Sequence, residues 1–124
     1  MSTRDIPFHA WPSELDGFTR QREGWIVTIR VLSTDGTSRI VARDLPLRGV
    51  SVAGTGRHDL VVTVGGAADR VAHQIPRATS VAIDETSDRV PRALILNAAD
   101  GTTSIEFRSP MRPEEVDGFL DHER

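Results

Sequence analysis

The chain has 124 residues, with 15 basic and 18 acidic side chains and a formal net charge of −3 at pH 7. This length suits one domain with an ordinary core, and the slightly acidic balance argues against a general nucleic-acid or membrane-surface binder, which would be strongly basic. The absence of cysteine excludes disulfides, thiolate nucleophiles and thiolate metal sites.

We expect a cytoplasmic protein with no membrane partner. The first residues lack the apolar run of a signal peptide, and no stretch approaches the roughly 20 apolar residues of a spanning helix. A chain without cysteine also fits a reducing compartment.

Residues 1–10 begin with a polar stretch and predict an N-terminal arm, whereas residues 11–23 predict a helix. In the second range charged residues separate apolar side chains at helical spacing, which are Trp11, Leu15 and Phe18. Gly24 is suited to end the helix in the left-handed conformation. The apolar stripe of this helix is expected to lie on a sheet.

Residues 25–109 predict an antiparallel sheet of about seven short strands, because strand follows strand with no helix between them. Two-residue hairpin turns are expected at Asp35-Gly36 and Asp100-Gly101. These turns put apolar side chains on one face of each hairpin, as a sheet with one buried side requires. The expected cross-strand pairs are Ile29 with Ala42, Val31 with Ile40, Leu96 with Ile105, and Leu94 with Phe107.

Together these elements predict a single α+β domain over residues 1–124. Its strongly curved antiparallel sheet is expected to form a roll or a partly open barrel, with the N-terminal helix packed on it. Residues 113–124 begin with a proline followed by acidic residues, which predicts a short C-terminal helical segment.

No catalytic, metal-binding or cofactor-binding motif is recognisable in the sequence. The four histidines lack the spacing of metal ligands, and the glycine-rich stretches at 54–56 and 65–66 complete neither a dinucleotide fingerprint nor a P-loop. The sequence therefore favours a protein that is not an enzyme and has no cofactor. Its charge and its few aromatic residues disfavour nucleic acid as a partner.

In the predicted register, arginine and aliphatic side chains gather on the outer face of the first hairpin. The group consists of Arg30, Arg39, Arg43, Ile26, Leu32 and Val41. Such a mixture is typical of protein interfaces, although arginine stems also cover stray apolar residues on solvated faces. The leading hypothesis is a non-catalytic protein-interaction or accessory module, which binds a protein partner or associates with itself as a homodimer.

An alternative hypothesis uses the loop end of the sheet. There, Arg57, His58 and His73 would line the opening of a barrel and bind a small molecule or an anion, in a binding protein or an enzyme. This hypothesis requires the three side chains to converge on one pocket.

Three segments of the chain support a family resemblance. They read RDIPFHAWPSELDGFTRQREGW, ARDLPLRGVSV and ALILNAADGTTSIEFRSPMRPEEVDG. Their marks are the Trp-Pro start of the helix, Arg-Asp-Leu-Pro-Leu, and Ala-Asp-Gly-Thr-Thr before the final Arg-Ser-Pro. Together they resemble a small bacterial family of unknown function, domain of unknown function 5335, over nearly the whole chain. The resemblance implies no activity, ligand or catalytic residue.

Overall fold

The computed structural model describes residues 2–53, 58–66, 70–86 and 90–108. Within these residues the chain forms one α-helix, one short 3-10 helix and eight strands. They are β1 (Ser2–Ile6), η1 (Phe8–Ala10), α1 (Trp11–Gln21), β2 (Ile26–Ser33), β3 (Ser38–Ala53), β4 (Asp59–Val64), β5 (Val71–Ile75), β6 (Ala78–Glu85), β7 (Pro91–Ala98) and β8 (Gly101–Phe107). The helical segment expected over residues 113–124 lies outside the described residues.

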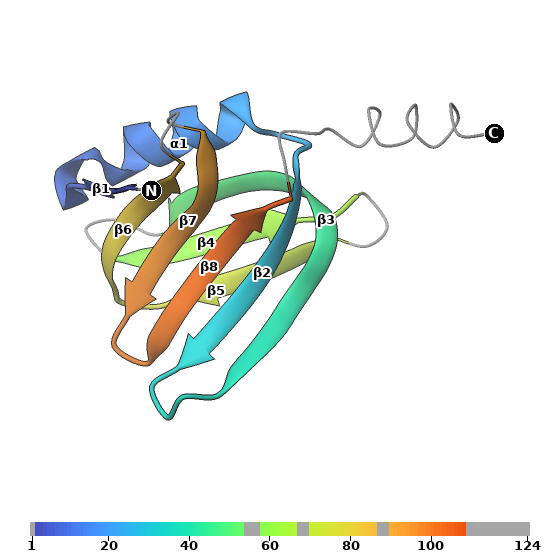
Figure 1. Cartoon of the computed structure of the whole chain (residues 1–124). Coiled ribbons are helices and arrows are strands. Elements are labelled where there is room, and N and C mark those ends of the chain that lie inside the picture. Colours follow the sequence, from blue (N-terminus) through green and yellow to red (C-terminus); the bar gives the residue numbers. More distant parts are fainter. Residues whose placement is uncertain (1, 54–57, 67–69, 87–89, 109–124) are drawn as a thin grey trace.

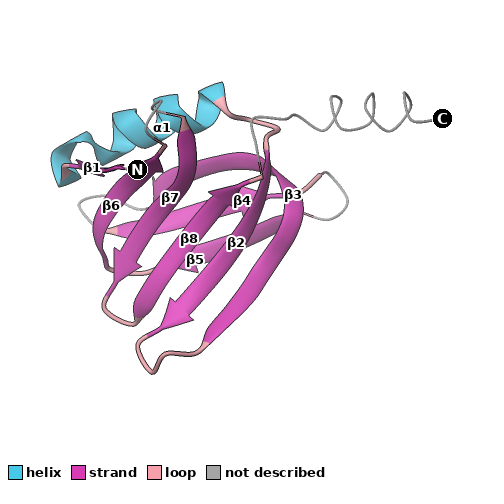
Figure 2. Cartoon of the chain, in the orientation of Figure 1, coloured by secondary structure: helices cyan, strands magenta, loops and turns pink. Residues whose placement is uncertain are grey.

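The strands form one antiparallel sheet in the order β1-β6-β7-β8-β2-β3-β4-β5, which is not closed. β3 is 16 residues long and bends, so that β4 and β5 lie behind β7, β8 and β2 (Figure 1). Figure 2 shows the resulting two layers of strands with α1 at one end. The α+β class and the large antiparallel sheet are therefore confirmed, with eight strands where about seven were expected.

The bend of β3 lies where the strand leaves β2 and begins to pair with β4. Asp44 has a φ of 53°, and the register with β4 shifts between Leu47 and Gly49. Such irregularities add local twist and re-aim the strand. As a result one continuous strand belongs to both layers.

The core lies between the two layers and under α1. Its largest fully buried side chains come from the helix and from six of the strands: Trp11, Leu15, Val27, Ile29, Leu47, Leu60, Val62, Val64, Ile83, Leu94, Leu96 and Ile105. β4 and β8 alternate between buried and half-buried positions, so in these two strands the period-two pattern of the sequence indicates the core-facing side.

α1 covers one end of the folded sheet and contacts β3 (Figure 1). Trp11 and Leu15 are buried, and the indole Nε1 of Trp11 donates a hydrogen bond to the carbonyl oxygen of Ile6 at 2.9 Å. The helix ends at Gln21, and Gly24 follows with a φ of 92°, the left-handed conformation expected for it. In the described part of the chain, no helix has the length and apolar character needed to cross a membrane.

The segment Ser2–Ile6, expected as part of an N-terminal arm, is the edge strand β1. It pairs with β6, and Ile6 lies opposite Val81 with only 4% of its surface exposed. This pairing joins segments far apart in the sequence, so no local pattern could have indicated it.

The β7–β8 hairpin has a register two residues away from the predicted one. Ala98 pairs with Gly101, and Leu94 lies opposite Ile105 rather than opposite Phe107. A shift of two residues keeps every side chain on its predicted face, because side chains alternate with a period of two. Position 101 requires glycine on steric grounds, since a Cβ atom there would lie 2.5 Å from the carbonyl oxygen of Leu32 on β2.

The β2–β3 hairpin follows the predicted register only at its centre. Ile29 lies opposite Ala42 as expected, but a register shift follows, so that Val31 lies opposite Arg39 rather than opposite Ile40. A shift of one residue moves side chains to the other face of the strand. The predicted outer position of Arg39 is therefore wrong.

Candidate functional site

A pocket of about 190 Å³ lies at the open end of the folded sheet, away from α1. The ends of β2, β3, β7 and β8 line one side of it and β5 lines the other, next to the lowest turns in Figure 1. We name it the mouth pocket. Its polar lining includes Ser33, Arg39, His73, Asp100 and Thr103.

His73 connects the two layers across the mouth pocket. Its side chain is half-buried, and its Nε2 lies 3.5 Å from the Oγ1 of Thr103 on β8. Burial lowers the pKa of the imidazole, the Arg39 guanidinium lowers it further, and the Asp100 carboxylate opposes both effects. Because an ordinary histidine has a pKa of about 6.5, His73 is mostly neutral at pH 7.

Arg39 reaches the mouth pocket because of the register shift in the first hairpin. It lies opposite Val31, and both side chains line the pocket. In the described part of the chain, no acidic side chain forms an ion pair with Arg39. The pocket therefore contains a cation with no ion-pair partner among the described residues, and the carboxylate of Asp100 lines the same pocket.

One wall of the mouth pocket is the last strand of the sheet. β5 has the sequence VAHQI, without a charged residue, and β4 is its only partner among the described strands. The amide of Gly65 donates to the carbonyl oxygen of Pro46 on β3 at 2.8 Å. Because the backbone groups of successive residues in a strand point to opposite sides, those of the preceding residue, Val64, point toward β5, where Val64 pairs with Val71. The same alternation along β5 directs the backbone groups of Ala72 and Gln74 away from β4, at the free edge.

The three residues of the predicted loop-end site are not brought together within the described residues. His73 lines the mouth pocket, whereas the His58 ring packs 3.8 Å from the Phe8 ring and 5.7 Å from the Trp11 ring, measured between centroids. Arg57 lies outside the described residues. The aromatic contacts give His58 a packing role beside the start of α1.

The predicted arginine surface is divided between the two faces of the sheet. Arg30 lies on the outer face, where its Nε is 3.1 Å from Oε2 of Glu106, and Arg43 is exposed. Val41 packs against the core, and Arg39 lies in the mouth pocket. The remaining two members are the half-buried Ile26 and Leu32, which is 49% exposed.

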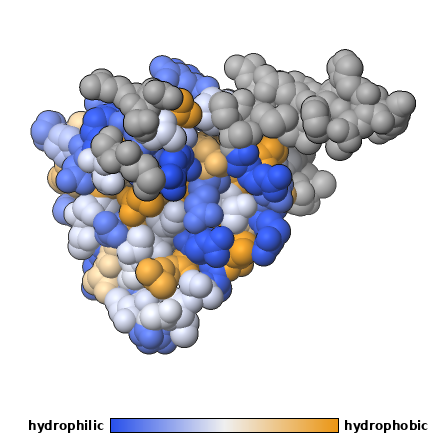
Figure 3. Space-filling model, viewed as in Figure 1, coloured by the Kyte–Doolittle hydropathy of each residue, from blue (hydrophilic) through white to orange (hydrophobic). Residues whose placement is uncertain are grey.

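The outer face of the front layer, which is formed by β7, β8, β2 and the first part of β3, carries both hydrophobic and hydrophilic side chains. In Figure 3 its hydrophobic areas are separate and surrounded by hydrophilic ones. Hydrogen bonds cross this face between side chains of adjacent strands, from Thr102 to Asn97 at 2.7 Å and from Asn97 to Ser80 at 2.8 Å. Its polar groups are therefore largely matched within the chain.

Sequence reasoning missed the roles of Asp100 and Thr103 in lining the mouth pocket. Asp100 was assigned to a turn and Thr103 to a strand, and only the folding of the sheet brings them near His73. Among the residues that the structure describes, no group of three or more His, Cys, Asp or Glu side chains is placed to hold a metal ion. The mouth pocket thus offers binding chemistry through an arginine, an imidazole and hydroxyl groups.

Comparison with known proteins gives a family and no activity. No curated protein and no solved structure matches the chain. One family model, described as a family of unknown function, matches residues 2–116 and so spans nearly all of the sequence, including every described strand. The chain therefore belongs to the family of unknown function DUF5335, in agreement with the resemblance seen in its sequence.

Proposed function

We propose that this protein is a non-catalytic protein-interaction module, which binds an extended segment of a partner polypeptide along the free edge of β5. The observation that supports this most directly is an uncharged sheet edge beside a pocket whose arginine forms no ion pair with a described acidic residue. The proposal keeps the cytoplasm as the compartment and requires no cofactor.

The backbone of β5 provides the first part of the argument. An exposed edge strand presents unpaired N–H and C=O groups to other chains, and proteins commonly blunt such edges with charges, prolines or bulges. β5 contains none of these over its five residues, and its register with β4 is regular. An incoming strand would extend the back layer by pairing with Ala72 and Gln74, the mode called β-augmentation.

The mouth pocket provides the second part. A strand added to β5 would lie over this pocket, because His73 and Gln74 line it from the same edge. Alternate side chains of that strand would point toward the front layer, where Arg39 has no acidic partner among the described residues. Arg39 is exposed at this pocket, and its guanidinium can donate two parallel hydrogen bonds to a carboxylate, so the partner segment should carry an aspartate or glutamate at an inward position.

The test is a selection of linear peptides from a random display library on the folded chain. We expect enriched peptides with an acidic residue at one fixed position. Arg39→Glu should reverse this preference and select arginine or lysine there. A set of enriched peptides with no charge preference would contradict the role of Arg39.

Backbone pairing has its own variant. Gln74→Pro removes an N–H that points to the free edge, so peptide binding should be lost. The hydrogen bonds between β5 and β4 do not use this N–H and should remain. Gln74→Ala removes the same side chain from the pocket lining but keeps the N–H, so it should retain peptide binding that Gln74→Pro loses. Equal binding by both variants would contradict strand addition. Sedimentation of the unmodified chain and of Gln74→Pro tests a further outcome. If the unmodified chain is a dimer and Gln74→Pro is a monomer, the free edge of β5 binds a second copy of this chain and not an acidic segment of another protein.

A further inference from the structure

A second hollow lies on the other side of the molecule, between α1 and the outer surface of the back layer. It is broadly open to solvent and has a volume of about 400 Å³. We name it the helix groove. The lining residues used below are Asp16 and Arg20 on α1, Glu23 just after it, Arg48, Gly49 and Ser51 on β3, Thr63 on β4, and Arg70 just before β5.

The floor of the helix groove consists of small side chains. Gly49 lies opposite Thr63 in the β3–β4 register, and the outward position two residues further along β3 is Ser51. A Cβ atom built on Gly49 would meet nothing within 4 Å, so the floor is open at this point. Two hydroxyl groups and an unobstructed backbone therefore lie at its base.

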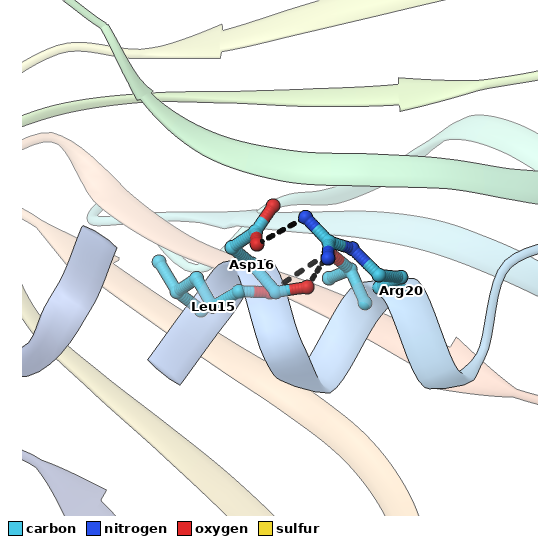
Figure 4. A network of polar contacts seen from close by, with 4 residues as sticks. Leu15, Asp16 and Arg20 are labelled. Carbon is cyan, nitrogen blue, oxygen red and sulfur yellow. Dashed lines mark hydrogen bonds and ion pairs between the residues drawn. The ribbon is translucent and has the colours of Figure 1, made fainter. Parts of the chain in front are cut away.

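Three arginines from separate elements surround this floor. Arg20 is held by Asp16, with 2.7 Å between Nη2 and Oδ2, an ion pair along one side of the helix (Figure 4). Arg48 is only loosely held by Glu23, with 4.0 Å between the nearest nitrogen and oxygen. Arg70 is exposed and forms no ion pair with a described acidic residue.

We propose that the helix groove binds a small organic molecule through a phosphoryl group that lies between Arg48 and Arg70. This site is separate from the β5 edge and does not depend on the function proposed for that edge. The phosphoryl oxygens receive hydrogen bonds from the two guanidinium groups and from the hydroxyl of Thr63. The organic part of the ligand lies along the floor toward Ser51.

The arrangement of donors favours a phosphoryl group over a carboxylate. Arginine is well suited to both anions, because its planar guanidinium can donate two parallel hydrogen bonds. In the helix groove the donors come from the floor and from two sides, which suits a tetrahedral group better than a planar one. The lining is polar, and this selects against a purely apolar ligand.

The two carboxylates of the groove set the strength of binding. Asp16 is already engaged by Arg20, whereas Glu23 competes with the ligand for Arg48 and repels an anion. Removing the Glu23 charge should therefore strengthen phosphoryl binding.

The test is a titration followed by two-dimensional amide NMR on the intact chain, with glucose 6-phosphate and inorganic phosphate as probes. We expect saturable shifts of the amides of Gly49, Ser51 and Thr63. Glucose and citrate serve as controls for the sugar and for a carboxylate of high charge. Equal shifts with citrate, or no saturable shifts with either phosphate probe, would overturn the proposal.

Variants locate the site. Arg48→Gln and Arg70→Gln should each weaken binding of glucose 6-phosphate by roughly tenfold, as expected for losing a hydrogen bond to a charged group. Arg43→Gln, an exposed arginine outside the groove, should leave it unchanged. Glu23→Gln should strengthen it.

Gly49→Val provides a steric test that changes no charge. The φ of Gly49 is not in the left-handed region and the space above it is empty, so a branched side chain fits without backbone strain. It should fill the floor and block glucose 6-phosphate while the melting temperature stays the same. A folded Gly49→Val protein that binds this probe normally would overturn the proposal, as would unchanged binding by Arg48→Gln and Arg70→Gln.

Discussion

The two edge strands of this sheet end it in different ways. β1 contains Arg4 and Asp5, and Arg4 lies opposite the buried Ile83, on the side of the strand that faces the core. β5 has neither charge nor proline, and its inward His73 lies beside the mouth pocket. Both strands have five residues, so length does not distinguish them.

The difference between these edges indicates which one is available for pairing. A charge that points inward from an edge strand is one of the devices by which proteins prevent unwanted strand addition, because an added strand would bury it. β1 has this device and β5 does not. The four predictions below test the contrast, starting with the anchoring of the strands to the core and ending with the surface charges.

The largest expected effect is the loss of a core anchor from an edge strand. Ile75 on β5 and Ile6 on β1 are each 4% exposed, so each fixes its strand to the core. Ile75→Ala and Ile6→Ala should each lower the free energy of unfolding by about 2–5 kcal/mol, measured by urea denaturation. Gln74→Ala, on the exposed face of β5, should change it by less than about 0.5 kcal/mol. A small loss for Ile75→Ala alone would mean that β5 is not held by the core.

The second prediction removes the protection of β1. Arg4→Val replaces the inward charge with a side chain that an added strand can bury, so the variant should self-associate as its concentration rises. Light scattering measures the mass, and Arg43→Val is the control because Arg43 is exposed, as Arg4 is, but lies away from β1. An Arg4→Val protein that stays at its original mass would show that something other than this charge protects the edge.

The third prediction concerns the pH dependence of stability at β5. Burial and the neighbouring Arg39 lower the pKa of His73, so the unfolded chain takes up its proton at a higher pH than the folded chain does. Stability should therefore fall as the pH drops below about 6.5, the ordinary value, and the loss should be complete below the folded pKa. Asp100 opposes this effect without reversing it.

Urea denaturation of the unmodified chain and of His73→Gln over this pH range isolates the contribution of His73. The difference between them should narrow as the pH falls, because only the unmodified chain loses the stability that the neutral imidazole supplies. A constant difference would mean that His73 has the same pKa in both states. Contributions from the rest of the chain are common to both proteins and cancel in the comparison.

The sequence indicated the parts of the fold that depend on local patterns. Helical spacing predicted α1, and the alternation in β7 and β8 put Leu94 and Ile105 on the buried face even though the register was wrong by two residues. Gly24 ends the helix segment as predicted. These features follow from side-chain periodicity and backbone sterics, which act over a few residues.

The candidate site depended on features that no local pattern contains. The register shift after Ile29 turned Arg39 inward, and the fold of the sheet then placed it near His73. The strand β1 likewise exists through its pairing with β6. Two Asp-Gly pairs also look alike in the sequence, yet Gly36 lies in a turn with a φ of 91°, whereas Gly101 begins a strand against the backbone of Leu32.

The smallest expected effect concerns the ion pair between Arg30 and Glu106 on the outer face. The two side chains remain 44% and 39% exposed, so solvent screens their attraction. A double-mutant cycle with Arg30→Ala and Glu106→Ala should give a coupling energy of about 0–1 kcal/mol that decreases with added salt. A coupling energy above about 2 kcal/mol would mean that solvent does not screen this pair.

Because the charges of Arg30 and Glu106 are matched within the chain, exchanging them in the double variant Arg30→Glu and Glu106→Arg should leave the peptides selected by the β5 edge unchanged. Arg39→Glu should alter that selection, since Arg39 lies in the mouth pocket without an acidic partner among the described residues. A changed selection on exchanging the pair would place the binding surface on the outer face instead.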